Sequence, residues 1–127
     1  MHESATAGFA DEIGFRLTEA GPDRVVLEWD VAPLHHQPYG IVHGGVYCTA
    51  VETAASVGAA TWFGDRGKVV GVANSTDFLR AVGDGHLTAV ATPLHRGRSQ
   101  QLWLVQITDE HDRLLARGQV RLQNLTV

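Results

Sequence analysis

The chain has 127 residues, of which 44% are hydrophobic and 19% are charged, so we expect one domain over residues 1–127 rather than two. No apolar run approaches the roughly 20 residues of a membrane span, and Met1 to Asp11 lack the basic start of a secretory signal. Ten basic residues against 14 acidic ones give a net charge of -4, which argues against binding to nucleic acid or an anionic membrane. A single cysteine, Cys48, excludes an internal disulfide and a multi-cysteine zinc site. These features predict a cytoplasmic protein.

The first regular pattern predicts a β-hairpin. In residues 24–31, apolar and polar side chains alternate with the period of a half-buried strand. The turn sequence at 20–23 precedes this strand, so residues 13–19 are expected to form the other arm.

Three or four further strands are predicted in the second half, from the segments 68–80, 86–95, 101–109 and 114–125. Short polar breaks at 83–85, 97–98 and 110–112 separate them, which favours consecutive hairpins and an antiparallel meander. Pro93 inside a strand predicts an edge position or a bulge. Alternation over 115–122 predicts that the last strand has one solvent-facing side.

Between these regions, residues 43–62 predict a long helix that ends near Gly64 and Asp65. The segment is rich in alanine and has no proline. Ala50, Ala54 and Gly58 recur every four residues, so one stripe of small side chains lets the helix approach a sheet or another helix closely. One buried helix against an antiparallel sheet of five or six strands is an α+β fold.

Glu52 is the most informative residue of this helix. It lies among alanines and valines, and burying a carboxylate is costly unless the group is paired or used. Ser56, one turn later, shares its face and can bond the carboxylate or a water beside it. The alternative is a structural glutamate at the solvent-exposed edge of the helix.

The helix start offers a second chemical group. Free backbone N–H groups in His43-Gly44-Gly45 can hold an oxyanion or a polarised carbonyl, although a plain glycine turn before a helix is the commoner case. Glu52 follows His43 by nine residues, or roughly 13 Å of helix, so the two cannot share one substrate atom within a chain. Two antiparallel helices would bring Glu52 of one chain near His43 of another, and the small stripe makes such pairing plausible. A joint site therefore predicts a dimer.

The spacing of Gln37, His43-Gly44-Gly45, Glu52 and Ser56 resembles that of the hotdog-fold acyl-CoA thioesterases. The most similar branch includes the glutamate-type 4-hydroxybenzoyl-CoA and the 1,4-dihydroxy-2-naphthoyl-CoA thioesterases. The resemblance covers most of the chain, including 74–80, the glycine turn at 93–99 and the final hairpin from 101 to 120. It implies a hotdog fold and hydrolysis of an aromatic acyl-CoA.

The resemblance also implies roles for individual residues. Glu52 would act as nucleophile or as general base on water, and the Gly44 N–H would polarise the thioester carbonyl. Gln37 and His43 would support the substrate or its carbonyl, and Ser56 would orient Glu52 or the water. The family builds each site across a dimer interface and usually forms tetramers. No metal or redox cofactor is implied.

Other positions are expected to bind the acyl or CoA part of the substrate. They are Asn74, which matches the strand after the family's helix, and the glycine-turn residues Arg96, Gly97, Arg98 and Ser99. Arg96 and Arg98 are candidates to meet the CoA phosphates, but arginines in surface turns are more often only solvated.

Three other interpretations are weaker. His35, His36 and His43 lack metal-ligand spacing and a completing acid, and Cys48 lacks a polarising neighbour that would make it a nucleophile. A hotdog dehydratase resembles a different arrangement, with its histidine after a strand. A non-catalytic hotdog protein that binds acyl-CoA or an acyl-carrier ligand is the remaining alternative.

Overall fold

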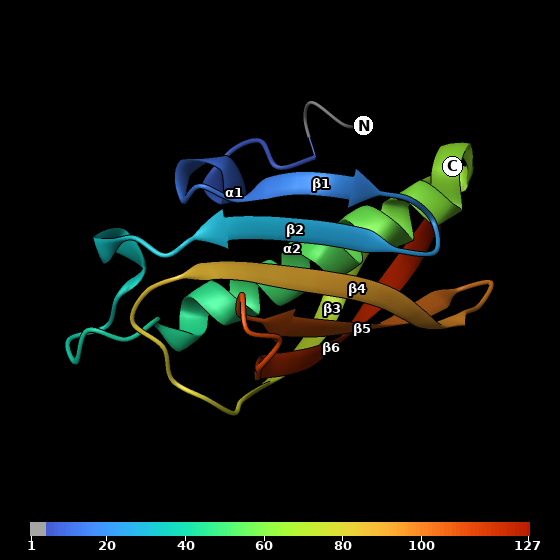
Figure 1. The fold of residues 1–127 in the computed structure, drawn as a ribbon. Coiled ribbons are helices and arrows are strands. Elements are labelled where there is room, and N and C mark those ends of the chain that lie inside the picture. Colours follow the sequence, from blue (N-terminus) through green and yellow to red (C-terminus); the bar gives the residue numbers. More distant parts are fainter. Residues whose placement is uncertain (1–4) are drawn as a thin grey trace.

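A computed structural model describes residues 5–127 as one long helix packed on a six-stranded sheet (Figure 1). Met1–Ser4, the first part of the segment considered above for a secretory signal, lie outside the described residues. Besides two short 3-10 turns at Pro33–His35 and Gly64–Arg66, the elements are α1 (Phe9–Glu12), β1 (Arg16–Ala20), β2 (Val25–Asp30), α2 (Gly44–Phe63), β3 (Gly67–Phe78), β4 (His86–Arg96), β5 (Gln100–Thr108) and β6 (Leu114–Thr126).

The predicted elements agree with the observed ones, and the fold is the hotdog fold that the resemblance implied. The expected hairpin is β1–β2, and α2 runs from Gly44 to Phe63. Gly64 ends the helix because its backbone has a φ of 63°, a conformation that glycine adopts without strain.

The expected meander is correct only for β4, β5 and β6. The strand order is β1-β2-β4-β5-β6-β3, and all pairings are antiparallel. The break at 83–85 is therefore not a hairpin turn, because β3 crosses to the far edge and pairs with the last strand. This placement leaves one side of β3 without a neighbouring strand in the described chain.

Two local expectations about the sheet are confirmed. The pairing of β4 with β5 shifts register between Pro93 and His95, so Pro93 lies at a bulge in an interior strand. Arg117, Gln119 and Arg121 on β6 are exposed, so the last strand has one solvent-facing side.

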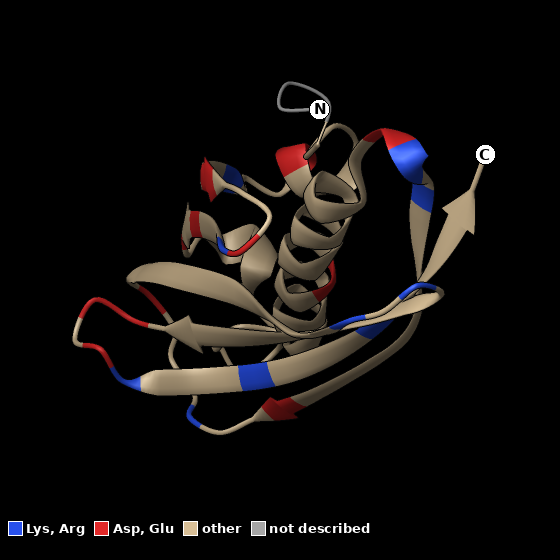
Figure 2. Ribbon diagram, turned by 90° about the vertical axis from the view of Figure 1, so that its right-hand side faces the viewer, with Lys and Arg blue, Asp and Glu red and all other residues tan. Residues whose placement is uncertain are grey.

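Helix α2 lies against the sheet of its own chain (Figure 2), and the burial of its small stripe shows that the stripe belongs to this contact. Ala50, Ala54 and Gly58 are buried, and a Cβ at Gly58 would lie 2.5 Å from the ring of Trp103. The stripe therefore cannot pair with another helix, and the expectation that it supports such pairing is wrong. No helix within residues 5–127 is long and apolar enough to cross a membrane.

Candidate active site

Glu52 lies in the middle of α2, half-buried beneath β3. The Nδ2 atom of Asn74 lies 3.2 Å from Oε1 of Glu52 and also donates to the Cys48 carbonyl over 3.1 Å. The Ser56 hydroxyl lies 3.5 Å from Oε2, at the outer limit of a hydrogen bond. The carboxylate is therefore contacted by one residue of the strand and one residue of its own helix, while it remains open to solvent.

A second hydrogen bond fixes the orientation of the Asn74 amide. The Thr76 hydroxyl donates to Oδ1 of Asn74 over 2.7 Å, which turns the NH₂ group toward Glu52. Asn74, which the sequence suggested as a substrate-binding residue, thus contacts the carboxylate directly. Its predicted contact with the acyl or CoA part stays a prediction.

Gly71 and Thr76 were not identified from the sequence. A Cβ on Gly71 would collide with the carboxylate of Glu52, so the glycine makes room for that group under β3. The sequence signal for Thr76 was period-two alternation, which places it on the same face of the strand as Asn74. This alternation does not show which face of the strand meets the helix.

His43 caps the start of α2, where the second group of predicted site residues lies. Its Nδ1 accepts a hydrogen bond of 2.8 Å from the N–H of Gly45, so in the neutral ring the proton lies on Nε2. Within residues 5–127, no acceptor bonds the N–H of Gly44, which is one of the first N–H groups of the helix. The ring of Phe78 packs so closely on Gly44 that a Cβ there would lie 2.7 Å away.

A hollow of about 310 Å³ lies beside Gly44. Its lining includes Gln37, whose side-chain oxygen accepts from the Tyr39 N–H, together with Tyr47, Phe78 and Arg80. Burial raises the pKa of Tyr47 to about 12, with a contribution from the Asp109 carboxylate, and the hydroxyl has no hydrogen-bond partner within the described residues. Tyr47 was not identified from the sequence, although it follows Gly44 by one helical turn.

The predicted catalytic residues form two separate groups in one chain. Glu52 and Ser56 line a hollow of about 390 Å³, whereas Gln37 and Gly44 line the other one described above. Eight residues of α2, or about 12 Å, separate Gly44 from Glu52. Within one chain, the Glu52 carboxylate and the Gly44 N–H therefore cannot contact the same substrate atom. The spacing in the sequence predicted this separation.

Comparison with known proteins shows the family of the chain. The family model of the thioesterase superfamily matches residues 39–116. The chain belongs to this superfamily. A Mycobacterium tuberculosis protein named as an esterase is 53% identical to this chain over 125 residues. The match covers 96% of this chain and 89% of that protein.

Two further relatives are informative. The 1,4-dihydroxy-2-naphthoyl-CoA hydrolase of Listeria monocytogenes is 35% identical over 108 residues, covering 85% of this chain and 88% of that protein. The crystal structure of S. sahachiroi AziG is 50% identical, with a TM-score of 0.92, and covers 95% of this chain and 98% of that chain. The protein is a thioester hydrolase, and the non-catalytic alternative is set aside.

The glycine turn of this thioesterase is held by its own chain. The Nη1 atom of Arg96 donates to Pro22 O and to Asp23 Oδ1, each over 2.8 Å, and the guanidinium lies 5.4 Å from the centre of the Trp62 ring. The carbonyls of Gly97 and Arg98 accept from the Asn124 amide, and the Ser99 carbonyl accepts from the Asn124 N–H. Arg98 itself is exposed. Contact of these residues with CoA stays a prediction.

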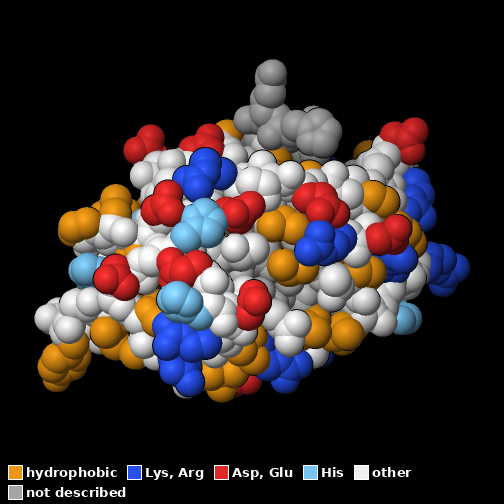
Figure 3. Space-filling view, in the orientation of Figure 1, with side chains coloured by type: hydrophobic (Ala, Val, Ile, Leu, Met, Phe, Trp, Pro, Cys, Tyr) orange, Lys and Arg blue, Asp and Glu red, His pale blue; other side chains and the backbone are white. Residues whose placement is uncertain are grey.

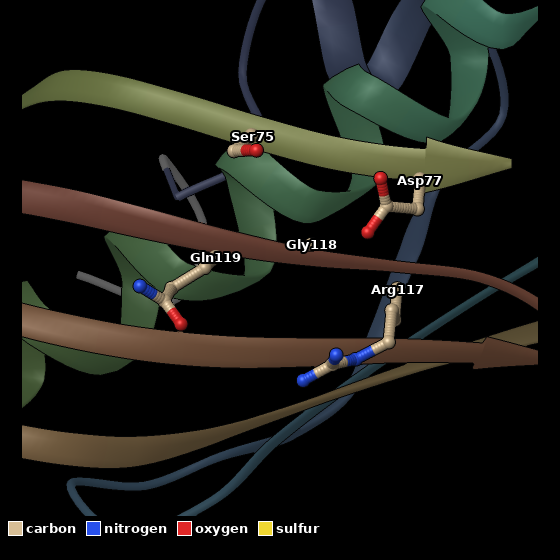
Figure 4. A pocket seen from close by; sticks show the side chains of 5 residues that line it. All are labelled: Ser75, Asp77, Arg117, Gly118 and Gln119. Atoms are coloured by element: carbon tan, nitrogen blue, oxygen red, sulfur yellow. The ribbon is translucent and has the colours of Figure 1, made fainter.

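Other polar residues of the thioesterase lie away from Glu52. Asp77 faces the side of the sheet opposite α2, where it lines a hollow of about 150 Å³ with Arg117 and Gln119 (Figure 4). The ring Nε2 atoms of His35 and His36 lie 2.7 Å from the carbonyl oxygens of Ile13 and Gly83. Within residues 5–127, no three histidine, cysteine or acidic residues are grouped to hold a metal ion.

Proposed function

We propose that this thioesterase hydrolyses aromatic acyl-CoA esters at sites shared between two copies of the chain. Glu52 of one copy attacks the thioester carbonyl as nucleophile, or activates water as general base, and the Gly44 N–H of the other copy polarises the carbonyl. The observation that carries this proposal is the separation of about 12 Å along α2 between two groups that both face open hollows.

The edge of β3 is the surface through which two copies would pair. Its outer side lacks a neighbouring strand in the described chain, and Val70, Val72 and Phe78 are exposed along it. Unpaired strand edges with apolar side chains are surfaces on which another strand readily adds. Antiparallel pairing of two β3 edges places the two α2 helices side by side and antiparallel, so each Glu52 comes toward the partner's helix start.

The proposed acyl class rests on the Listeria relative, whose name states that it hydrolyses an aromatic acyl-CoA.

The release of CoA tests the proposed reaction. It can be followed with a thiol reagent on benzoyl-, 4-hydroxybenzoyl-, 1-hydroxy-2-naphthoyl- and octanoyl-CoA. We expect aromatic esters to be cleaved fastest, and Glu52→Ala to lower kcat by about 10²- to 10⁴-fold. Asp65→Ala, at an exposed acid beyond α2, is the control. Full activity of Glu52→Ala would contradict the proposed role.

Mixing two inactive variants tests whether the site is shared. Glu52→Ala and Gln37→Ala are each expected to be weakly active, because each lacks one half of the site. In a mixed dimer one of the two sites is intact, so coexpression at equal levels should restore about a quarter of the original activity. No recovery in dimers shown by mass spectrometry to be mixed would place both halves of the site within one chain.

A further inference from the structure

One loop carries the polar groups that lie at the start of α2. Residues 36–43 include Gln37 and the helix cap His43, and they lead directly into the Gly44 N–H. The loop is neither helix nor strand, apart from a single β-bridge between its ends. Connecting segments of this kind are more mobile than helices and strands. The position of the polar groups therefore depends on what holds the loop.

The His36 ring ties the loop to the connection between β3 and β4. Its Nε2 atom lies 2.7 Å from the Gly83 carbonyl oxygen, and because a carbonyl only accepts, Nε2 is the donor. One residue earlier in that connection, the Val82 carbonyl accepts from the Val42 N–H over 2.9 Å. A Cβ on Gly83 would lie 2.6 Å from the Gly40 carbonyl oxygen, so the two backbones also lie close together.

The His35 ring ties the base of the loop to a different segment. His35 is 2% exposed, and its Nε2 atom donates over 2.7 Å to the carbonyl of Ile13, which lies between α1 and β1. Its Nδ1 atom accepts from the Ala32 N–H over 2.9 Å, so both nitrogens of the neutral ring are used. The His35 carbonyl accepts from the His43 N–H over 2.8 Å. The residue that caps α2 is thus bonded to the residue that is anchored at Ile13.

Two adjacent histidines therefore fasten the loop to two separate parts of the chain. An apolar side chain at position 36 would leave the Gly83 carbonyl without its donor and the loop without that anchor. A reaction that needs its groups placed to within about 1 Å is sensitive to the loss of such restraint.

We infer that His35 and His36 are positioning residues that fix the loop and the Gly44 N–H for the reaction. This inference rests on the proposed function, in which Gln37 supports the substrate and the Gly44 N–H polarises the thioester carbonyl. Each ring Nε2–H is already bonded within the chain, so the two histidines act through the loop rather than on the substrate. Polarisation of the carbonyl matters most in the transition state, so loss of either anchor lowers kcat more than it raises KM.

Substitution of His36 tests the inference, because this ring is only half-buried. In His36→Leu we expect kcat for benzoyl-CoA to fall about tenfold or more, while KM changes less than about twofold. His36→Gln places an amide N–H near the position of Nε2, so it should recover most of the lost activity. An unchanged kcat in His36→Leu, or no recovery in His36→Gln, would overturn the inference.

Two further variants complete this experiment. His111→Leu, at an exposed histidine between β5 and β6, is the matched control and should resemble the original protein. His36→Asn, whose side chain is too short to reach Gly83, replaces His36→Leu if that variant does not fold.

The buried His35 is tested by keeping one ring contact at a time. His35→Gln keeps the reach to Ile13, whereas His35→Asn keeps only an acceptor for the Ala32 N–H. We expect His35→Gln to retain at least about threefold more of the original kcat than His35→Asn. The reverse order would overturn the role of His35.

Combined variants test whether His36 acts through the loop. Gln37→Ala removes a group of the same loop, whereas Ser56→Ala removes a group beside Glu52. We expect His36→Leu to cost less activity in the Gln37→Ala background than in the original protein, and the full amount in the Ser56→Ala background. An equal cost in all three backgrounds would overturn the inference.

Hydrogen exchange separates this inference from the proposed function, because it needs no turnover. We expect His36→Leu to speed amide exchange about tenfold or more at residues 37–44 and to leave residues 52–56 unchanged. If cleavage of the esters needs neither Gln37 nor Glu52 but exchange rises at 37–44, the proposed function is wrong and the restraint by the histidines stands. If cleavage needs both residues but His36→Leu changes neither exchange nor kcat, the proposed function stands and the inference is wrong.

Discussion

At the scale of single residues, the carboxylate of Glu52 is positioned by neighbours that differ in kind. Asn74 supplies an N–H from the strand, Thr76 fixes which way that amide faces, and Gly71 supplies space. A carboxylate that reacts with a thioester carbonyl or its water must be held to well within an ångström. The two polar neighbours and the missing side chain together provide that restraint.

Gly71→Ala should therefore damage activity more than stability. The added methyl group displaces the end of the flexible Glu52 side chain, which costs the fold little. Misplacement of a reacting group by about 1 Å can cost about 100-fold in rate, so we expect a loss of kcat of that order with little change in Tm. Ala73→Ser, on the opposite face of the same strand, is the control. A fully active Gly71→Ala protein would show that the carboxylate does not need this position.

At the scale of elements, a charged cluster links β1, β2 and β4 on the sheet face away from α2 (Figure 3). The two ring nitrogens of His86 lie 2.8 Å from Asp30 and 2.7 Å from Glu28, and Thr18 donates to the other oxygen of Glu28. Hydrogen bonds to Asp30 and Glu28 raise the pKa of His86, and those from His86 lower the pKa of Asp30. Protonated His86 therefore joins the edge hairpin to the interior strand.

The raised pKa of His86 predicts a pH-dependent stability. The contribution of protonated His86 is complete below the pKa of the unfolded chain, about 6.5, and is lost as the pH rises through the higher pKa of the folded state. The Tm of the original protein should thus fall between pH 6 and pH 9 relative to that of His86→Gln. Circular dichroism melts at several pH values measure the difference. Parallel Tm curves for the two proteins would contradict the prediction.

Much of the architecture at this scale was predictable from local pattern. Alternation located β2 and β6, and the alanine-rich segment located α2 to within one residue at each end. The position of β3 was not predictable, because its partner β6 is distant in the chain and a short break at 83–85 imitates a hairpin. Because the position of β3 was not predictable, the roles of Gly71 and Thr76 were missed too. Their contacts follow only once β3 is known to lie over Glu52.

At the scale of the whole molecule, the proposed sharing of the site between two chains depends on the exposed edge of β3. Val72→Lys places a charge on this edge, and lysine on an edge strand opposes pairing with another strand. We expect the variant to be monomeric by analytical ultracentrifugation and to lose activity although Glu52 and Gly44 are unchanged.

Leu94→Lys is the matched control for the edge variant. Leu94 is exposed to a similar extent, 51% against 54% for Val72, but it lies on β4 rather than on β3. This control should keep both the assembly and the activity of the original protein. A fully active monomer of Val72→Lys would refute a shared site.

The pairing of β3 with the last strand also bears on the synthesis of the chain. Residues 67–78 leave the ribosome well before residues 114–126, and β6 is the one strand in the described chain that pairs with β3. At about 5–20 residues per second, residues 79–113 take about 2–7 s to be added. During that interval the nascent β3 has both edges open, so loss of the C-terminal strand through early termination would leave a long unpaired segment prone to aggregate. The 13 residues of β6 therefore complete the sheet and end this exposure.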